Sequence, residues 1–197
     1  MQAAIDAATD GDTIIVHPGF YPGTIRFNGK VLHLRSSAPG VREVTETTIL
    51  HGSFAGSTIR FLGTEHGAIV EGFTITGGSA ENGGGIHGGS TPGARATIRY
   101  NIIANNTAEL RGGGIYGVQG GISGNTIRGN FATEGGGLAN CHFLVSSNEI
   151  SGNRAAHGAG AFRCSADFTK NLIADNSAFE RGGALHTCSG TLEDNVI

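Results

Sequence analysis

The sequence lacks long apolar runs, a strong charge of either sign and paired cysteines, and each absence excludes a class of protein. No stretch of the 197 residues approaches the ~18 apolar residues that a membrane-spanning helix needs. The formal net charge is only −3, so we expect no basic surface for nucleic acid or for acidic membranes. The three cysteines have no paired spacing, which excludes a disulfide-rich scaffold and a zinc site.

Proline is scarce while glycine is abundant. The 35 glycines do not recur at every third position and only four prolines accompany them, so the chain is not collagen-like. Isoleucines stand at regular places between the glycines, which argues against a disordered linker.

An internal repeat of 23–24 residues runs through the second half of the sequence. Two sets of asparagines share this period: Asn101, Asn125, Asn148, Asn171 and Asn195, and Asn106, Asn130, Asn153 and Asn176. Glycine runs that begin at Gly112, Gly135, Gly158 and Gly182 keep the same spacing. Because these runs recur in every unit and no Lys-Ser/Thr pair follows them, they do not indicate a phosphate-binding loop.

Each unit contains short apolar–polar alternations broken by Gly or Asn, which indicates strands of three to five residues. No unit holds the ten or so residues of helical periodicity that a helix would need. A leucine-rich repeat has a similar period, but its longer leucine-rich strand is absent. We therefore predict an all-β fold, a right-handed single-stranded parallel β-helix with about 23–24 residues per coil.

The predicted β-helix is one domain, residues 1–197, in three parts. Residues 1–21 form a short N-terminal capping helix and a first strand, residues 22–69 form irregular coils, and residues 70–197 form regular coils. A five-residue excess within residues 88–96 predicts a loop that leaves one coil. The sequence stops inside a unit with an uncapped C-terminus, so we expect this to be an N-terminal fragment of a longer protein.

The first residues resemble the N-terminal cap of pectin-lyase-like right-handed β-helices, through Gln2–Ala8, Gly11–Val16 and Pro18–Tyr21. That family includes polysaccharide lyases and glycoside hydrolases.

The regular coils are similar to the repeats of chlamydial-type polymorphic outer-membrane proteins. The GGA[ILV] signature of that family stands at Gly182–Leu185, and its FxxN signature stands at Phe168–Asn171. The resemblance implies a β-helix that is secreted or displayed on the cell surface, often as an adhesin. These motifs specify the fold better than the activity.

Two sets of equivalent residues are candidates for binding. The residue after the glycine-linked Ile or Leu should point outward by strand alternation; this set is His87, Tyr116, Ala139, Phe162 and His186. Exposed rings in a column could stack on sugars or contact a protein partner, unless loops or a neighbouring domain cover them. The residue four positions before the same Ile or Leu is polar; this set is Asn82, Arg111, Glu134, His157 and Arg181.

In the second set, Glu134 stands between two cations, Arg111 and His157. Ion pairing between neighbouring coils is the simpler interpretation, and a polar ligand site is the alternative. If both sets flank one groove, they form the best candidate site; its members are His87, Tyr116, Phe162, His186, Arg111, Glu134, His157 and Arg181.

The three cysteines, Cys141, Cys164 and Cys188, are also equivalent in the repeat. We predict that they are thiols that fill the core, because Val118 takes the same position one coil earlier. A disulfide between adjacent coils stays open, although in-register parallel strands suit its geometry badly. No metal site is expected.

The repeat region contains no recognisable catalytic set, because its acidic residues are scattered and polygalacturonase motifs are absent. The leading hypothesis is a non-catalytic binding, adhesion or structural module without a cofactor, whose partner is a polysaccharide or a host or cell-surface protein. The alternative is a polysaccharide lyase or glycoside hydrolase of the pectin-lyase-like superfamily. Calcium would be a cofactor only under the lyase alternative.

Overall fold

The computed structural model describes residues 1–89 and 93–197, and it is a parallel β-solenoid of about seven turns. The predicted all-β parallel β-helix is therefore confirmed. Each turn passes through three sheets, and every strand pairs in parallel with the equivalent strands of the neighbouring turns. Residues 90–92 of the predicted loop lie outside the described residues.

The strands of the three sheets are as follows. Sheet 1 contains β1 (Thr13–Val16), β4 (His33–Ser36), β7 (Ile69–Glu71), β11 (Thr97–Arg99), β15 (Ile122–Ser123), β18 (His142–Ser146), β22 (Ser165–Thr169) and β26 (Leu192–Glu193). Sheet 2 contains β2 (Gly19–Pro22), β5 (Thr48–His51), β8 (Thr74–Thr76), β12 (Ile102–Ala104), β16 (Thr126–Arg128), β19 (Glu149–Ser151) and β23 (Leu172–Ala174). Sheet 3 contains β3 (Ile25–Arg26), β6 (Ile59–Arg60), β10 (Ile86–His87), β14 (Ile115–Tyr116), β17 (Leu138–Ala139), β21 (Ala161–Phe162) and β25 (Leu185–His186).

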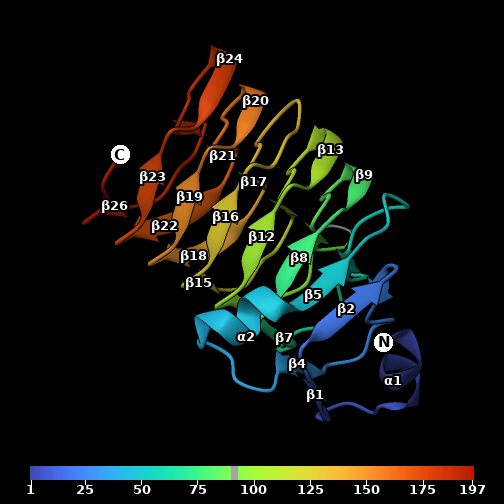
Figure 1. The fold of residues 1–197 in the computed structure, drawn as a ribbon. Coiled ribbons are helices and arrows are strands. Elements are labelled where there is room, and N and C mark those ends of the chain that lie inside the picture. Colours follow the sequence, from blue (N-terminus) through green and yellow to red (C-terminus); the bar gives the residue numbers. More distant parts are fainter. Residues whose placement is uncertain (90–92) are drawn as a thin grey trace.

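Four further strands lie between sheets 2 and 3 along the chain: β9 (Ser79–Asn82), β13 (Thr107–Arg111), β20 (Arg154–His157) and β24 (Ser177–Arg181). They form two pairs, β9 with β13 and β20 with β24, and single bridges through Phe131 and Glu134 connect the pairs. Figure 1 shows the strands stacked in chain order between the N-terminal and C-terminal ends, with these four strands along one edge.

The interior holds apolar side chains from most strands of the three sheets and two columns of asparagine. The backbone N–H and the side-chain amide of Asn125 both donate to Asn148 Oδ1, at 2.9 and 3.0 Å. The same pattern repeats along both asparagine sets, so each buried amide is satisfied by the next coil. The asparagine ladders that the sequence predicts are therefore confirmed, and they fix the register between coils.

The predicted capping helix is α1 (Gln2–Ala7), and its Ile5 is fully buried in the core. A second short helix, α2 (Arg42–Thr47), was not predicted from the sequence. It lies outside the coils, as Figure 1 shows, and Arg42 Nε is 2.8 Å from Glu46 Oε1 across one helical turn. In the described part of the chain, no helix is long and apolar enough to cross a membrane.

Candidate binding face

Sheet 3 carries an outward column of side chains that includes the predicted ring-bearing set. Strand pairing places His87 beside Tyr116 and Phe162 beside His186, with Ala139 between them. The column also continues toward the N-terminus, where Arg60 pairs with His87 and Arg26 pairs with Arg60. We call the seven residues the outward column: Arg26, Arg60, His87, Tyr116, Ala139, Phe162 and His186.

The second predicted set also forms a continuous column. Bridges and strand pairs connect Asn82 to Arg111, Arg111 to Glu134, Glu134 to His157, and His157 to Arg181. We call these five residues the charged column. Arg111 Nε lies 2.7 Å from Glu134 Oε2, so the expected pairing between coils is present there.

A tight glycine turn brings the two columns together. Gly112 has a φ of 65°, and a Cβ at this position would lie 2.5 Å from Ile115 O and 2.8 Å from Tyr116 Cβ. Only glycine fits this conformation and this space. The turn places Arg111 close to Tyr116. The pKa of Arg111 is raised above its ordinary value, mainly by the hydrogen bond to Glu134, and Tyr116 contributes to the same shift.

In the C-terminal coils the columns pack against each other and leave little surface for a ligand. The His186 ring stacks on both His157 and Phe162, each at 5.7 Å between ring centroids, and Arg163 lies 5.1 Å from the Phe162 ring. Phe162 is only 3% exposed. The expectation that Phe162 is an exposed ring is therefore wrong, because its neighbours cover it.

Glu134 stands between Arg111 and His157 as expected, but it forms an ion pair with only one of them. Glu134 pairs with Arg111, whereas His157 Nε2 lies 3.4 Å from Glu180 Oε2 on its own strand pair. Arg181 is exposed and forms no ion pair with any described residue.

The N-terminal part of the face is open. A cavity of about 320 Å³ lies between the two columns, and the residues that line it are Gly56, Ser57, Arg60, Ala80, Glu81, Asn82 and His87. This volume falls at the lower end of the range for small-molecule sites, about 300–1,000 Å³. Asn82 is the residue of the charged column that lines this cavity.

His87 is a neutral hydrogen-bond donor at the edge of this cavity. Burial is the main cause that lowers its pKa, and the positive charge of Arg60 lowers it further against an opposing effect of Glu81. Its Nδ1 accepts a hydrogen bond from the N–H of Gly89 at 3.0 Å, so the neutral ring carries its proton on Nε2. His87 Nε2 can therefore donate to a ligand.

Two arginines of the outward column are not among the residues predicted from the sequence. Arg26 and Arg60 are both exposed, stand on adjacent coils about 4.8 Å apart, and form no ion pair with any described residue. Like charges placed side by side destabilise a sheet, so this pair is suited to an anionic ligand rather than to stability. Arg26 and Arg60 are 34 residues apart in the sequence, and Arg60 and His87 are 27 residues apart. Because these spacings differ from the 23–24-residue repeat, the period does not reveal that the three residues form one column.

The described residues of this face include neither a metal-binding cluster nor a cysteine. In residues 1–89 and 93–197, no group of three His, Cys, Asp or Glu side chains could hold a metal ion. Cys141 and Cys164 are fully buried and Cys188 is half-buried, all as free thiols inside the coils, as predicted.

The protein is a parallel β-solenoid whose sheet 3 face is partly open and carries two unpaired arginines among the described residues. Comparisons with protein-family models, with curated proteins and with solved structures found no match. The resemblances to pectin-lyase-like and polymorphic outer-membrane proteins therefore stay predictions.

Proposed function

We propose that this protein is a non-catalytic binding module, secreted or displayed on a cell surface, whose sheet 3 face binds an extended polysaccharide. The observation that carries the proposal is the column Arg26, Arg60, His87 and Tyr116 on four successive coils. It presents two cations, one hydrogen-bond donor and one aromatic ring in a straight line with a uniform step. A chain molecule with anionic groups and ring faces matches that series.

The resemblance of residues 168–171 and 182–185 to surface-displayed repeats supports the proposed location. The fold supports the role, because a solenoid presents equivalent positions of successive coils as one continuous surface.

The test measures binding of polygalacturonate, chondroitin sulfate, dextran and xylan to the immobilised protein. We expect the two acidic polymers to bind, binding to weaken as salt rises, and Arg60→Ala and Tyr116→Ala each to reduce affinity severalfold. Arg128→Ala, an exposed arginine on sheet 2, is the matched control and should bind as the wild type does. Absence of binding to all four polymers, or equal loss in the control, would contradict the proposal.

A polysaccharide lyase is the second candidate, because Tyr116 lies beside the Arg111 guanidinium at the same face. Two observations favour binding over catalysis. His87 Nδ1 already accepts the Gly89 N–H, so this ring is not placed as a base. Among the described residues, Glu81 is the one carboxylate that lines the cavity, whereas glycoside hydrolases use a pair of carboxylates.

Ultraviolet absorbance of unsaturated sugar ends distinguishes the two candidates. We expect no absorbance increase with any uronate polymer. An increase that Tyr116→Phe abolishes would establish the lyase instead.

A further inference from the structure

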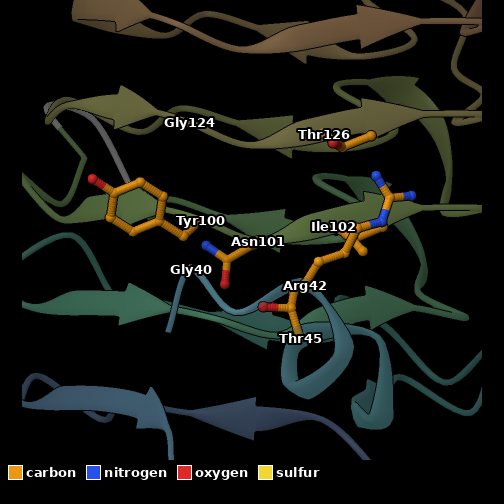
Figure 2. A pocket seen from close by; sticks show the side chains of 8 residues that line it. All are labelled: Gly40, Arg42, Thr45, Tyr100, Asn101, Ile102, Gly124 and Thr126. Carbon is orange, nitrogen blue, oxygen red and sulfur yellow. The ribbon is translucent and has the colours of Figure 1, made fainter. Parts of the chain in front are cut away.

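A second pocket lies at the bend between sheets 1 and 2, away from the sheet 3 face. It has a volume of about 170 Å³, and its lining residues are Gly40, Arg42, Thr45, Tyr100, Asn101, Ile102, Gly124 and Thr126. Helix α2 and the residues before it form one wall, and the outer surface of β12 and β16 forms the floor. Figure 2 shows the Tyr100 ring and the Arg42 side chain toward opposite ends of this pocket.

Tyr100 occupies a backbone position that disfavours a tyrosine. Its φ is 57°, in the left-handed region, and the equivalent residues of the flanking coils are glycines, Gly72 and Gly124. Bulky residues rarely adopt this conformation, but Ser147, Lys170 and Asp194 adopt it at the same bend of later coils, so the bend itself imposes it. The ring is 49% exposed, so burial in the core does not explain the choice.

Two neighbours, Gly124 and Arg99, contact the Tyr100 ring. A Cβ at Gly124 would lie 2.9 Å from the ring, so the glycine lets the ring lie flat on the neighbouring coil. The Arg99 guanidinium carbon lies 5.9 Å from the ring centroid. Arg99 in turn donates to the buried carboxylate of Glu71.

Glu71 ties this arginine to a third coil, because Glu71 Oε1 is 2.7 Å from His33 Nε2. The ring is thus supported by a network across successive coils of sheet 1. A rigid, half-exposed aromatic ring is a favourable surface for the apolar face of a sugar.

The polar groups of the pocket suit hydroxyl groups rather than a carboxylate. Thr126 offers a half-buried hydroxyl, and Arg42 is the one charged residue among the described residues of the lining. The Arg42 side chain is 83% exposed and is paired with Glu46, with Arg42 Nε 2.8 Å from Glu46 Oε1. The remaining guanidinium N–H groups can donate to neutral oxygen atoms.

The volume of the pocket limits the size of the ligand that it can hold. About 170 Å³ is roughly half of the smallest typical small-molecule site, about 300 Å³, so the pocket holds one ring rather than a chain. We propose that it binds a single neutral sugar unit, with the ring stacked on Tyr100 and hydroxyl groups on Thr126 and Arg42. This site is independent of the sheet 3 face.

The test is ligand-observed NMR on the intact protein with D-glucose, D-galactose, N-acetyl-D-glucosamine and D-glucuronate. Tyr100→Gly removes the ring and introduces the residue that both flanking coils use, so the fold should be preserved. We expect millimolar binding of at least one neutral sugar, and a dissociation constant at least tenfold higher in Tyr100→Gly. Tyr100→Phe should bind nearly as the wild type does, because the ring is kept.

Two controls isolate the pocket. Lys170→Gly introduces glycine at the equivalent bend three coils further on, and Tyr116→Ala alters only the sheet 3 face. Neither should change the affinity for the neutral sugar. The proposal is overturned if no neutral sugar binds, if binding survives in Tyr100→Gly, or if glucuronate binds more tightly than glucose.

Discussion

The side-chain amide of Asn125 donates to the side-chain oxygen of Asn148 across one coil, at 3.0 Å, and Asn148 repeats the contact with Asn171 at 3.1 Å. Asn148 also donates to the carbonyl oxygens of Ile122 and Ser146, and it is 2% exposed. Each amide is thus both donor and acceptor in a buried column.

Asn148→Ala should destabilise the protein strongly, because it leaves buried donors of Asn125 without an acceptor. A buried group without its partner costs about 1–3 kcal/mol, so we expect a loss of about 3 kcal/mol in the free energy of unfolding. Urea denaturation followed by circular dichroism measures this loss. Arg128→Ala, exposed on the neighbouring coil, should change stability by less than about 0.5 kcal/mol; equal losses in the two variants would argue against the ladder's role.

Gly112→Ala should be destabilising by about 2–4 kcal/mol, because the new Cβ meets Ile115 O and Tyr116 Cβ and alanine disfavours a φ of 65°. Gly121→Ala is the matched control, since a Cβ at Gly121 has no atom within 4 Å. It should be neutral or slightly stabilising. Thermal unfolding of both variants compares them, and a tolerated Gly112→Ala would disprove the steric argument.

Stability should fall in acid partly through Glu71. Burial acts to raise the pKa of this carboxyl, but hydrogen bonds from Arg99 and His33 outweigh it, so the pKa lies below its ordinary value of 4.5. A lowered pKa means that the stabilising effect is complete above about pH 4.5 and is lost as the pH falls through the folded-state value.

Glu71→Gln should therefore flatten the acid limb of the stability curve. Denaturation midpoints measured between neutral pH and pH 3 give this slope. Glu43→Gln, an exposed carboxyl on α2, should leave the slope unchanged. An unchanged slope in Glu71→Gln would show that the carboxyl titrates normally.

The thiols should be nearly inert in the folded protein. Cys141 and Cys164 are fully buried, and the neighbouring thiol of Cys141 is the main cause that raises the pKa of Cys164 well above its ordinary value. The pKa of Cys188 is raised for the same kind of reason, by Cys164 and by burial. Ellman's reagent should label at most Cys188 before denaturation and three thiols after it, without reductant. Fewer than three in the denatured protein would indicate a disulfide.

The period of the sequence was sufficient to predict the columns of the regular coils. Residues such as Asn125 and Asn148, or Arg111 and Glu134, fall one period apart, and in a solenoid one period is one step along the axis. Contacts between equivalent positions follow directly from that rule.

Features that depend on side-chain packing or on irregular coils could not be predicted in the same way. Phe162 is buried by His186 and Arg163, and no spacing rule says which rings cover one another. The network of His33, Glu71 and Arg99 joins residues 38 and 28 positions apart, outside the repeat. Helix α2 is inserted between β4 and β5, so this early coil does not follow the 23–24-residue period.

The asparagine ladders have a consequence for how such a chain changes its length. Because every amide meets an identical amide, the junction between Asn101 and Asn125 is interchangeable with the junction between Asn125 and Asn148. Deleting or duplicating one 23-residue unit would again place asparagine against asparagine, so the ladders would keep their hydrogen bonds across the new junction. The molecule can therefore be shortened or extended in whole coils by recombination within its own gene, without new contacts having to arise.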